Sequence, residues 1–242
     1  MLARRLSAGV LTACALAGAA ITVFAPAGAA IRSSVSDPSV LYRAALATTR
    51  SWSVHYASTS TQSGSTLVVS GDAGPASGSQ TVTMGTGTIS ILVIGGITYV
   101  KGNPVGLEKL VGFSASEAAP IAGQWIDFPT DDATFASVVV GVRSADVAKE
   151  LALKGPLTLG RARTVDGVAA DAIEGTQTFG HKTVHVVLYV RARGSHVPVE
   201  EDSLDVQGQP TSAEHVVYAS WGEVVRPQAP QATVTLGPIS ST

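Results

Sequence analysis

Apolar and polar positions alternate with a period of two over most of this chain, which is the pattern of β-strands with one buried face. The alternation is clearest at Val184, Val186, Leu188, Val190 and Ala192. Clusters of Gly, Ser, Asp and Pro separate such stretches and are typical of turns. The pattern predicts a three-stranded antiparallel meander between 51 and 84. It also predicts five strands at 157–165, 168–177, 184–193, 196–206 and 214–225.

A β-hairpin joins these two strand-rich regions. Residues 89–94 and 97–100 are rich in β-branched side chains and flank Gly95 and Gly96. Two such runs around a pair of glycines favour a hairpin with a tight turn. A further short strand is expected over 123–129, ended by Pro129.

Five stretches change to a period of about 3.6 residues, which predicts helices. The first is expected at about 38–50, because Asp37 can cap it and Pro38 suits the first helical position. A second helix is expected at 107–111, and a third begins with Ser114 or Ser116 as its cap. Asp131 or Asp132 caps a fourth, which carries Phe135, Val138 and Val139. A fifth begins near Ser144.

Together these elements predict an α+β fold with a single antiparallel sheet of about 10–11 strands. A sheet of that width tends to curl. With helices packed across its concave side it becomes a half-barrel. Its interior has two interpretations, an ordinary packed core or a hydrophobic cavity between helices and sheet. Aromatic residues make up only 5% of the chain, which leaves less bulk to fill a broad sheet.

The N-terminus has the pattern of a secretory signal over 1–30. Arg4 and Arg5 precede an apolar run that ends in small residues at Ala29 and Ala30. Cys14 follows a lipobox-like Leu-Thr-Ala, so cleavage after Ala29 or Ala30, lipidation at Cys14 and a retained anchor all stay open. A polar spacer at 31–37, a domain at 38–226 and a Pro-rich tail at 227–242 follow.

Composition and motifs argue against several kinds of function. Charged residues make up 14% of the 242 residues and the net charge is -2, so there is no basic field for nucleic acid. No Gly-x-Ser-x-Gly motif is present, and His181 and His185 are spaced for a helix but lie in a strand pattern. The acidic pair at 131–132 and the acidic triplet at 200–202 are interpreted as caps and turns, with a weak calcium contact as the alternative. We therefore expect no enzyme, no cofactor and no metal site.

Several stretches resemble one known group of proteins. They are Gly-Ile-Thr-Tyr-Val-Lys-Gly-Asn at 96–103, Ala-Gly-Gln-Trp-Ile-Asp-Phe-Pro at 122–129, Val-Asp-Gly-Val at 165–168, Leu-Tyr-Val at 188–190 running to Val-Pro-Val-Glu at 197–200, and Val-Tyr-Ala-Ser-Trp-Gly-Glu at 217–223. In pattern and order they resemble the actinobacterial envelope lipoproteins of the LppX and LprG group, relatives in fold of the LolA and LolB carriers. The resemblance covers about 38–226 and contains no catalytic signature.

This resemblance implies a half-barrel whose hydrophobic cavity accepts lipids, glycolipids or lipoglycans. The family offers no motif for the cavity wall, so its residues are inferred from the apolar faces of the expected helices. The inferred lining is Leu107, Leu110, Val111, Ile121, Phe135 and Val138. The relatives carry a well-placed lipobox, and Cys14 departs from it.

Two functions follow from the sequence. The first is non-enzymatic binding and transfer of a lipid in the cell envelope by an exported monomer, with a membrane surface or an envelope transporter as its partner. The second is a protein-binding sensor or assembly module of the same fold that carries no lipid.

Overall fold

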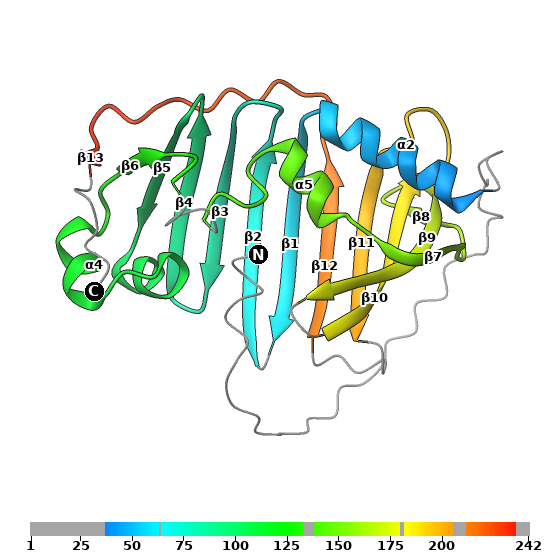
Figure 1. Cartoon of the computed structure of the whole chain (residues 1–242), viewed down its shortest axis with the longest axis horizontal. Coiled ribbons are helices and arrows are strands. Elements are labelled where there is room, and N and C mark those ends of the chain that lie inside the picture. The colour runs from blue at the N-terminus through cyan, green and yellow to red at the C-terminus, as the bar shows by residue number, and fades with distance from the viewer. Residues whose placement is uncertain (1–36, 63, 133–137, 180–181, 206–211, 236–242) are drawn as a thin grey trace.

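The computed structural model describes residues 37–62, 64–132, 138–179, 182–205 and 212–235. Its strands form one open, curled sheet of 13 strands with helices on one face (Figure 1). Paired strands run antiparallel, except that β13 (Val234–Thr235) pairs in parallel with β6 (Ile126–Pro129). The predicted α+β fold with a single curled, largely antiparallel sheet is confirmed.

Two meanders meet in the middle of this sheet. The strand order is β13-β6-β5-β4-β3-β2-β1-β12-β11-β10-β9-β7, with β8 paired to β9. The first meander comprises β1 (Val54–Gln62), β2 (Ser65–Ala73), β3 (Gly78–Met84), β4 (Gly87–Ile94), β5 (Ile97–Gly102) and β6. The second comprises β7 (Lys154–Leu159), β8 (Arg163–Val165), β9 (Val168–Phe179), β10 (Lys182–Arg191), β11 (Pro198–Asp205) and β12 (Ser212–Ala219). Pairing of β1 with β12 makes them one continuous surface.

The described helices cover the concave face in two groups. On the β9–β12 half lies α2 (Pro38–Ser51), and next to it α5 (Ser144–Glu150) lies over β1 and β2 in the middle of the sheet. On the β3–β5 half lie α3 (Pro104–Gly106), the π-helical turn η1 (Leu107–Val111) that continues it, and α4 (Ala115–Ile121). The predicted caps hold for two of them: Asp37 accepts a hydrogen bond from the Ser39 N–H at 2.8 Å, and Ser114 caps α4. None of the described helices combines the length and the apolar character needed to span a membrane.

Three expectations about element boundaries are wrong. Residues 138–140 form a turn, because the chain reverses at Gly141 with a φ of 85°, so no helix carries Val138 and Val139. The strand expected at 157–165 is two strands, because the ladder to β9 is interrupted after the Gly160 N–H, which donates to the Ala172 carbonyl at 2.9 Å, and resumes at Arg163. The strand expected at 214–225 is β12, which ends at Ala219 because Ser220 adopts a φ of 51°.

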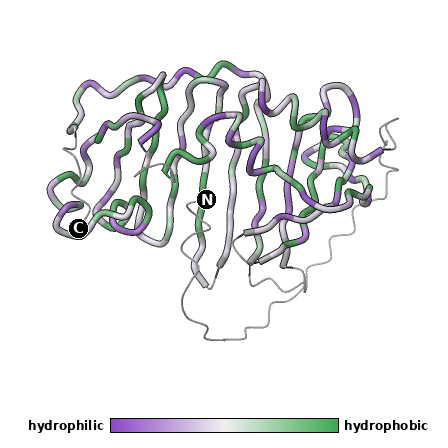
Figure 2. The backbone as a smooth tube through the Cα atoms, in the orientation of Figure 1, coloured by the Kyte–Doolittle hydropathy of each residue, from purple (hydrophilic) through white to green (hydrophobic). Residues whose placement is uncertain are grey.

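Two hydrophobic cores lie side by side between helices and sheet. The β4 core is centred on Ile89, Ile91, Val93, Val100 and Leu107. The β10 core is centred on Leu41, Ala45, Ile173, Leu188 and Val190. Figure 2 shows hydrophobic positions on the strands of both halves. Full burial of one such aliphatic side chain is worth about 1.5–3 kcal/mol, so each group of helices is held mainly by its own core.

The segment after β12 runs along one end of the strands to the far edge of the sheet, shown in orange to red in Figure 1. The Gly222 N–H donates to the Ser53 carbonyl at 2.9 Å, and the Ser77 hydroxyl donates to the Val225 carbonyl at 3.3 Å. The Val234 N–H then donates to the Trp125 carbonyl at 2.8 Å, where β13 joins the sheet. The predicted domain limits at 38–226 stay a prediction.

A candidate ligand cavity between the two cores

A cavity of about 110 Å³ lies on the concave face where the β4 core and the β10 core meet. Val69 of β2 lies at this junction, because it packs against both cores and also lines the cavity. The apolar lining consists of Leu67, Val69, Val82, Ile91, Leu110, Val138, Val140, Val147 and Val216. The polar lining consists of Tyr56, Ser58, Gln80, Glu150, Glu201, Glu214 and Tyr218.

Strand register separates the apolar from the polar lining. Ser58 of β1 pairs with Val69 on one side and with Val216 of β12 on the other. Val69 pairs in turn with Val82 of β3, whereas Val216 pairs with Glu201 of β11. Paired residues of an antiparallel sheet point to the same face, so one row of side chains crosses the cavity floor. That row changes from aliphatic at β3 to acidic at β11.

A tyrosine and a glutamine lie next to each other on the sheet floor of the cavity, in the β1–β3 part. The Gln80 Nε2 donates a hydrogen bond to the Tyr56 hydroxyl at 2.7 Å, across β2. Gly71 lies beneath this contact, and a Cβ there would come within 2.8 Å of the Tyr56 oxygen, so the strand needs a glycine. Burial raises the pKa of the Tyr56 phenol, while the bond from Gln80 opposes the shift. The phenol therefore stays protonated at neutral pH and can donate a hydrogen bond to a ligand.

The opposite part of the lining carries carboxylates. Glu201 is only 4% exposed. The Gln177 Nε2 donates to the Glu150 backbone carbonyl at 2.9 Å and lies 3.4 Å from Glu201 Oε1. The Ser58 hydroxyl donates to Glu214 Oε1 at 2.9 Å. Burial raises the pKa of the Tyr218 phenol, and the charges of Glu201 and Glu214 add to that shift, so this part of the lining is electronegative.

The cavity includes some of the residues inferred from the sequence. Leu110 and Val138 line it. Leu107, Val111 and Ile121 are not among its lining residues and pack in or against the β4 core instead. Phe135 and the possible lipidation site Cys14 lie outside the described residues. A ligand contact for any of them stays a prediction.

The acidic part of the lining is what the sequence interpretation missed. Residues 200–202 do not form a turn, because all three lie inside β11. Alternation along the strand sends the side chain of Glu201 to the concave face and those of Glu200 and Asp202 to the outer face. Recognising 198–205 as one strand would have shown that the three neighbouring carboxylates divide between the two faces of the sheet, because successive side chains of a strand alternate.

A second polar cluster lies on the outer face of β11. Carboxylate oxygens of Glu200 and Asp202 and a ring nitrogen of His215 lie within 4.8 Å of one another, a grouping that could hold a metal ion. Arg163 already forms ion pairs with Glu200 and, at 3.3 Å, with Asp202, and stacks 3.8 Å from the centre of the Tyr189 ring. The guanidinium group supplies the positive charge there, so the cluster is explained as an ion-pair network.

A curled, open sheet with helices on its concave face defines the class of fold, and solved structures resemble it. LprF from Mycobacterium bovis aligns with 80% of this chain and 96% of its own length, at 12% identity and a TM-score of 0.52. The lipoprotein LppX from Mycobacterium tuberculosis aligns with 79% and 99%, at 20% identity and a TM-score of 0.48. The MucA/MucB complex structure from Pseudomonas aeruginosa aligns with 82% and 64%, at 15% identity and a TM-score of 0.42.

These comparisons bear on the fold. No family model and no curated protein sequence matches the chain. At 12% identity the likeness to LprF concerns backbone architecture and transfers no site residue. The fold that the sequence resemblance implies, a curled half-barrel sheet with helices on its concave side, is confirmed by the likeness to LprF.

Proposed function

We propose that this chain binds a lipid, glycolipid or lipoglycan in the cavity between its two cores and carries it within the cell envelope, without catalysing a reaction. The aliphatic part of the cavity lining is the observation that carries the proposal. Each methylene group that moves from water into such surroundings gains about 0.8 kcal/mol. The shared fold with LprF and the sequence resemblance to envelope carriers support the same function.

Export is part of this proposal. The signal-like segment at 1–30 would direct the chain across the membrane, with cleavage after Ala29 or Ala30, lipidation at Cys14 or retention as an anchor as the possible outcomes. Intact mass measurement of the exported protein separates the three outcomes, since each leaves a different N-terminus.

The size of the cavity sets a condition for loading. Its volume of about 110 Å³ is below the roughly 150 Å³ that holds a benzene molecule, and ligand pockets generally have about 300–1,000 Å³. An acyl chain therefore needs the cover over the cavity to move outward. Residues 138–142 and α5 form this cover, and Ser144 ties it down, with its N–H donating to the Gly74 carbonyl at 3.1 Å and its hydroxyl to the Arg50 carbonyl at 3.2 Å.

A substitution that fills the cavity tests the proposal. The change Val69→Trp places an indole at the junction of the two cores, whereas Val68→Trp, one residue away, points to the outer face, where Val68 is 44% exposed. The full chain, produced in an actinobacterial host and recovered without detergent, is compared by native mass spectrometry. Lipid-mass adducts on the wild type and on V68W, but not on folded V69W, support the proposal. Equal adducts on both variants place the lipid elsewhere.

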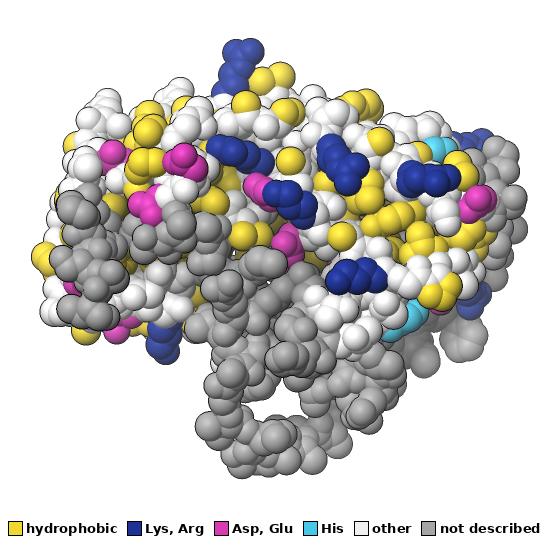
Figure 3. Space-filling model, in the orientation of Figure 1, with side chains coloured by type: hydrophobic (Ala, Val, Ile, Leu, Met, Phe, Trp, Pro, Cys, Tyr) yellow, Lys and Arg dark blue, Asp and Glu magenta, His cyan; other side chains and the backbone are white. Residues whose placement is uncertain are grey.

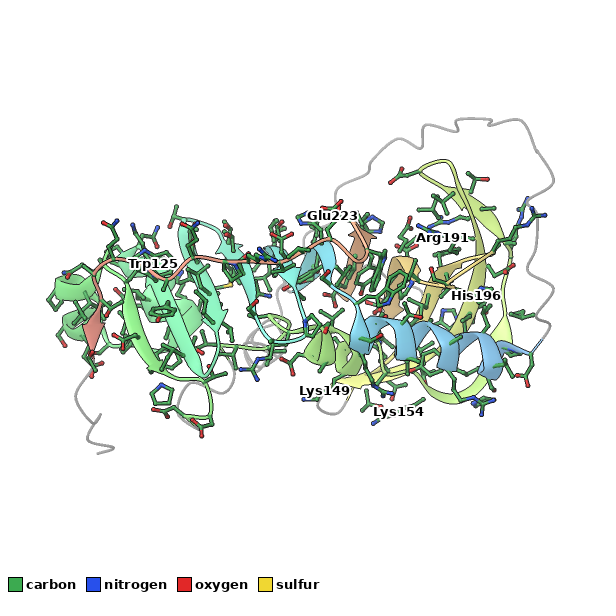
Figure 4. The ribbon with its side chains drawn as sticks, turned by 90° about the horizontal axis from the view of Figure 1, so that it is seen from above. Trp125, Lys149, Lys154, Arg191, His196 and Glu223 are labelled. Carbon is green, nitrogen blue, oxygen red and sulfur yellow. The ribbon has the colours of Figure 1, made fainter. Side chains whose placement is uncertain are left out.

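A basic surface suggests how the carrier would approach a membrane. Exposed Arg43 and Arg50 on α2, Lys149 on α5 and Lys154 on β7 lie on the helical side of the sheet. Figure 3 shows basic side chains gathered over this region, and Figure 4 places Lys149 and Lys154 on the side of α2, opposite Glu223. A basic side chain near an anionic membrane contributes about 1 kcal/mol. Stronger cosedimentation with anionic than with neutral vesicles is expected, and Lys149→Glu should weaken it.

The small cavity also favours the alternative of a protein-binding module whose interior is filled by side chains. That module would carry no lipid. A clean apoprotein mass for the wild type, with no uptake of added glycolipid or phospholipid, would move the assignment to it.

A further inference from the structure

A groove lies on the outer face of the sheet, near the end of β12. Its lining includes Val217, which pairs with Glu200, a residue whose side chain points to the outer face. The β8–β9 hairpin contributes Val165 and Val168, and Figure 4 shows Arg191, another lining residue, on the side of the sheet away from α2. The volume of the groove is about 360 Å³, against about 110 Å³ for the cavity between the cores, and it lies within the roughly 300–1,000 Å³ of ligand pockets. The groove can therefore admit a ligand without opening.

Two indoles belong to this lining, and solvent reaches one of them. Trp52, the residue that caps the C-terminus of α2, is 42% exposed, and its backbone N–H donates to the Thr48 carbonyl at 2.9 Å. Trp221 is half-buried, and its Nε1 donates to the Pro198 carbonyl at 2.8 Å. The Trp221 ring is held by the fold, whereas the Trp52 ring is available to a ligand.

An acidic and a basic side chain belong to the same lining, and the backbone holds both in place. Asp166 lies in the tight turn of the β8–β9 hairpin, where φ is 45° at Asp166 and 81° at Gly167. Arg191 ends β10, where its N–H donates to the Val197 carbonyl at 2.9 Å and its carbonyl lies 3.0 Å from Nδ1 of His196. Within the described chain, neither charged side chain has an ion-pair or hydrogen-bond partner.

The charges of the groove balance, which bears on the chemistry of its ligand. One carboxylate and one guanidinium group give the lining a net charge of zero, so neither an anion nor a cation gains a net attraction. The carboxylate accepts hydrogen bonds and the guanidinium group donates them. A sugar hydroxyl can do both. The C–H groups of a sugar ring carry a slight positive charge and can stack on the negative face of an indole.

We propose that this groove binds a neutral saccharide, with a sugar ring stacked on Trp52 and its hydroxyl groups held by Asp166 and Arg191. The half-buried side chains of Val168 and Val217 would contact the C–H edge of the ring. Because the groove and the cavity lie on opposite faces of the sheet, this site does not depend on lipid binding in the cavity. A lipid-free glycan and the headgroup of a glycolipid offer the same hydroxyl chemistry.

Neutral and charged trisaccharides test this chemistry. The full chain is titrated by ligand-observed NMR with maltotriose, cellotriose and mannotriose, with anionic trigalacturonate, and with the cationic trimer of glucosamine. We expect at least one neutral trisaccharide to bind with a Kd of about 1 mM or tighter, and more tightly than both charged ones. The dodecyl glycoside of that trisaccharide identifies the source of the sugar. A gain in affinity that Trp52→Ala removes indicates a glycolipid headgroup, and equal affinity indicates a lipid-free glycan.

Single substitutions locate the sugar. Trp52→Ala should weaken binding of the neutral trisaccharide at least about tenfold, and Asp166→Asn, which removes the charge but tolerates the positive φ, at least about threefold. Arg193→Gln, at an exposed position outside the lining, should leave the affinity unchanged. If Trp52→Ala does not fold, Asp166→Asn tests the same site.

Three results would overturn the site. They are unchanged affinity in Trp52→Ala, no binding of any neutral trisaccharide, and tighter binding of either charged one. Each leaves the proposed lipid binding standing, because that function is measured on the cavity variants at Val69 and Val68.

Discussion

The two halves of the concave face are covered in different ways. Over the β4 core, η1 and α4 contribute Leu107, Leu110 and Ile121, and the contacts are aliphatic. Over the β10 core, buried polar side chains also hold the helices by hydrogen bonds. The Tyr42 hydroxyl of α2 bonds to the backbone that follows α5. The Gln177 amide of β9 donates to the backbone carbonyl of the last residue of α5. Packing energy is non-directional, whereas hydrogen bonds fix positions. Both halves have an apolar core, and the second half has in addition directional bonds that hold polar groups near the cavity.

Truncating a core leucine on the aliphatic half should have the largest effect. Leu107 is fully buried, so Leu107→Ala should lower the free energy of unfolding by about 2–5 kcal/mol, through lost burial and a new cavity. Leu110→Ala removes the same atoms from the same helical turn, but Leu110 faces the cavity on one side, so we expect it to lower the free energy of unfolding by less. Urea unfolding measures both. An equal loss at the two positions would mean that Leu110 is packed like the core.

The fold was predictable because the strand and helix patterns are local. The alternation at 184–192 and the two glycines at 95–96 specify strands and a hairpin that the structure contains. One apolar lining residue was also within reach, because Leu110 lies on the apolar face of a predicted helix. Glu201 was not, since its role depends on β11 pairing with β10 and β12, a long-range fact that local pattern does not encode.

Removing the Tyr42 hydroxyl, on the half that contains the β10 core, should lower the free energy of unfolding by a smaller amount. The Tyr42 hydroxyl donates to the Leu151 carbonyl at 3.0 Å and accepts from the Leu153 N–H at 2.7 Å, so it joins α2 to the end of α5. Tyr42→Phe leaves these buried groups without their partner and should cost about 1–3 kcal/mol of unfolding free energy. Tyr99→Phe, on the outer face of β5, is the control. A loss for Tyr42→Phe no larger than for the control would contradict this view of the α2 anchor.

The cap of α4 offers a still smaller change on the aliphatic half. The Ser114 hydroxyl accepts from the Glu117 N–H at 3.3 Å, and the Ser114 N–H donates to Glu117 Oε2 at 2.8 Å, which is a capping box. Ser114→Ala should lower the free energy of unfolding by about 1 kcal/mol. Ser116→Ala, inside the first turn, should change it less, and the reverse order would place the cap elsewhere.

The smallest effect should be a pH dependence of opposite sign on the two halves. Hydrogen bonds from Ser114 lower the pKa of Glu117 below its usual 4.5, so this carboxylate stabilises the fold above that pH and loses its contribution as the pH falls through the lowered pKa. On β11, burial raises the pKa of Glu200 despite the opposing charge of Arg163. Its contribution is therefore present below 4.5 and is lost as the pH rises through the raised pKa.

Two charge-neutral variants separate these contributions. Relative to Glu117→Gln, the wild type should lose stability as the pH falls below 4.5, whereas relative to Glu200→Gln it should lose stability as the pH rises above 4.5. Urea unfolding midpoints across that range measure both differences. Because Gln can still accept the Ser114 bond and contact Arg163, each comparison isolates ionisation from lost contacts. Differences of the same sign would mean that Arg163 outweighs burial at Glu200, and the two halves would then respond to acid alike.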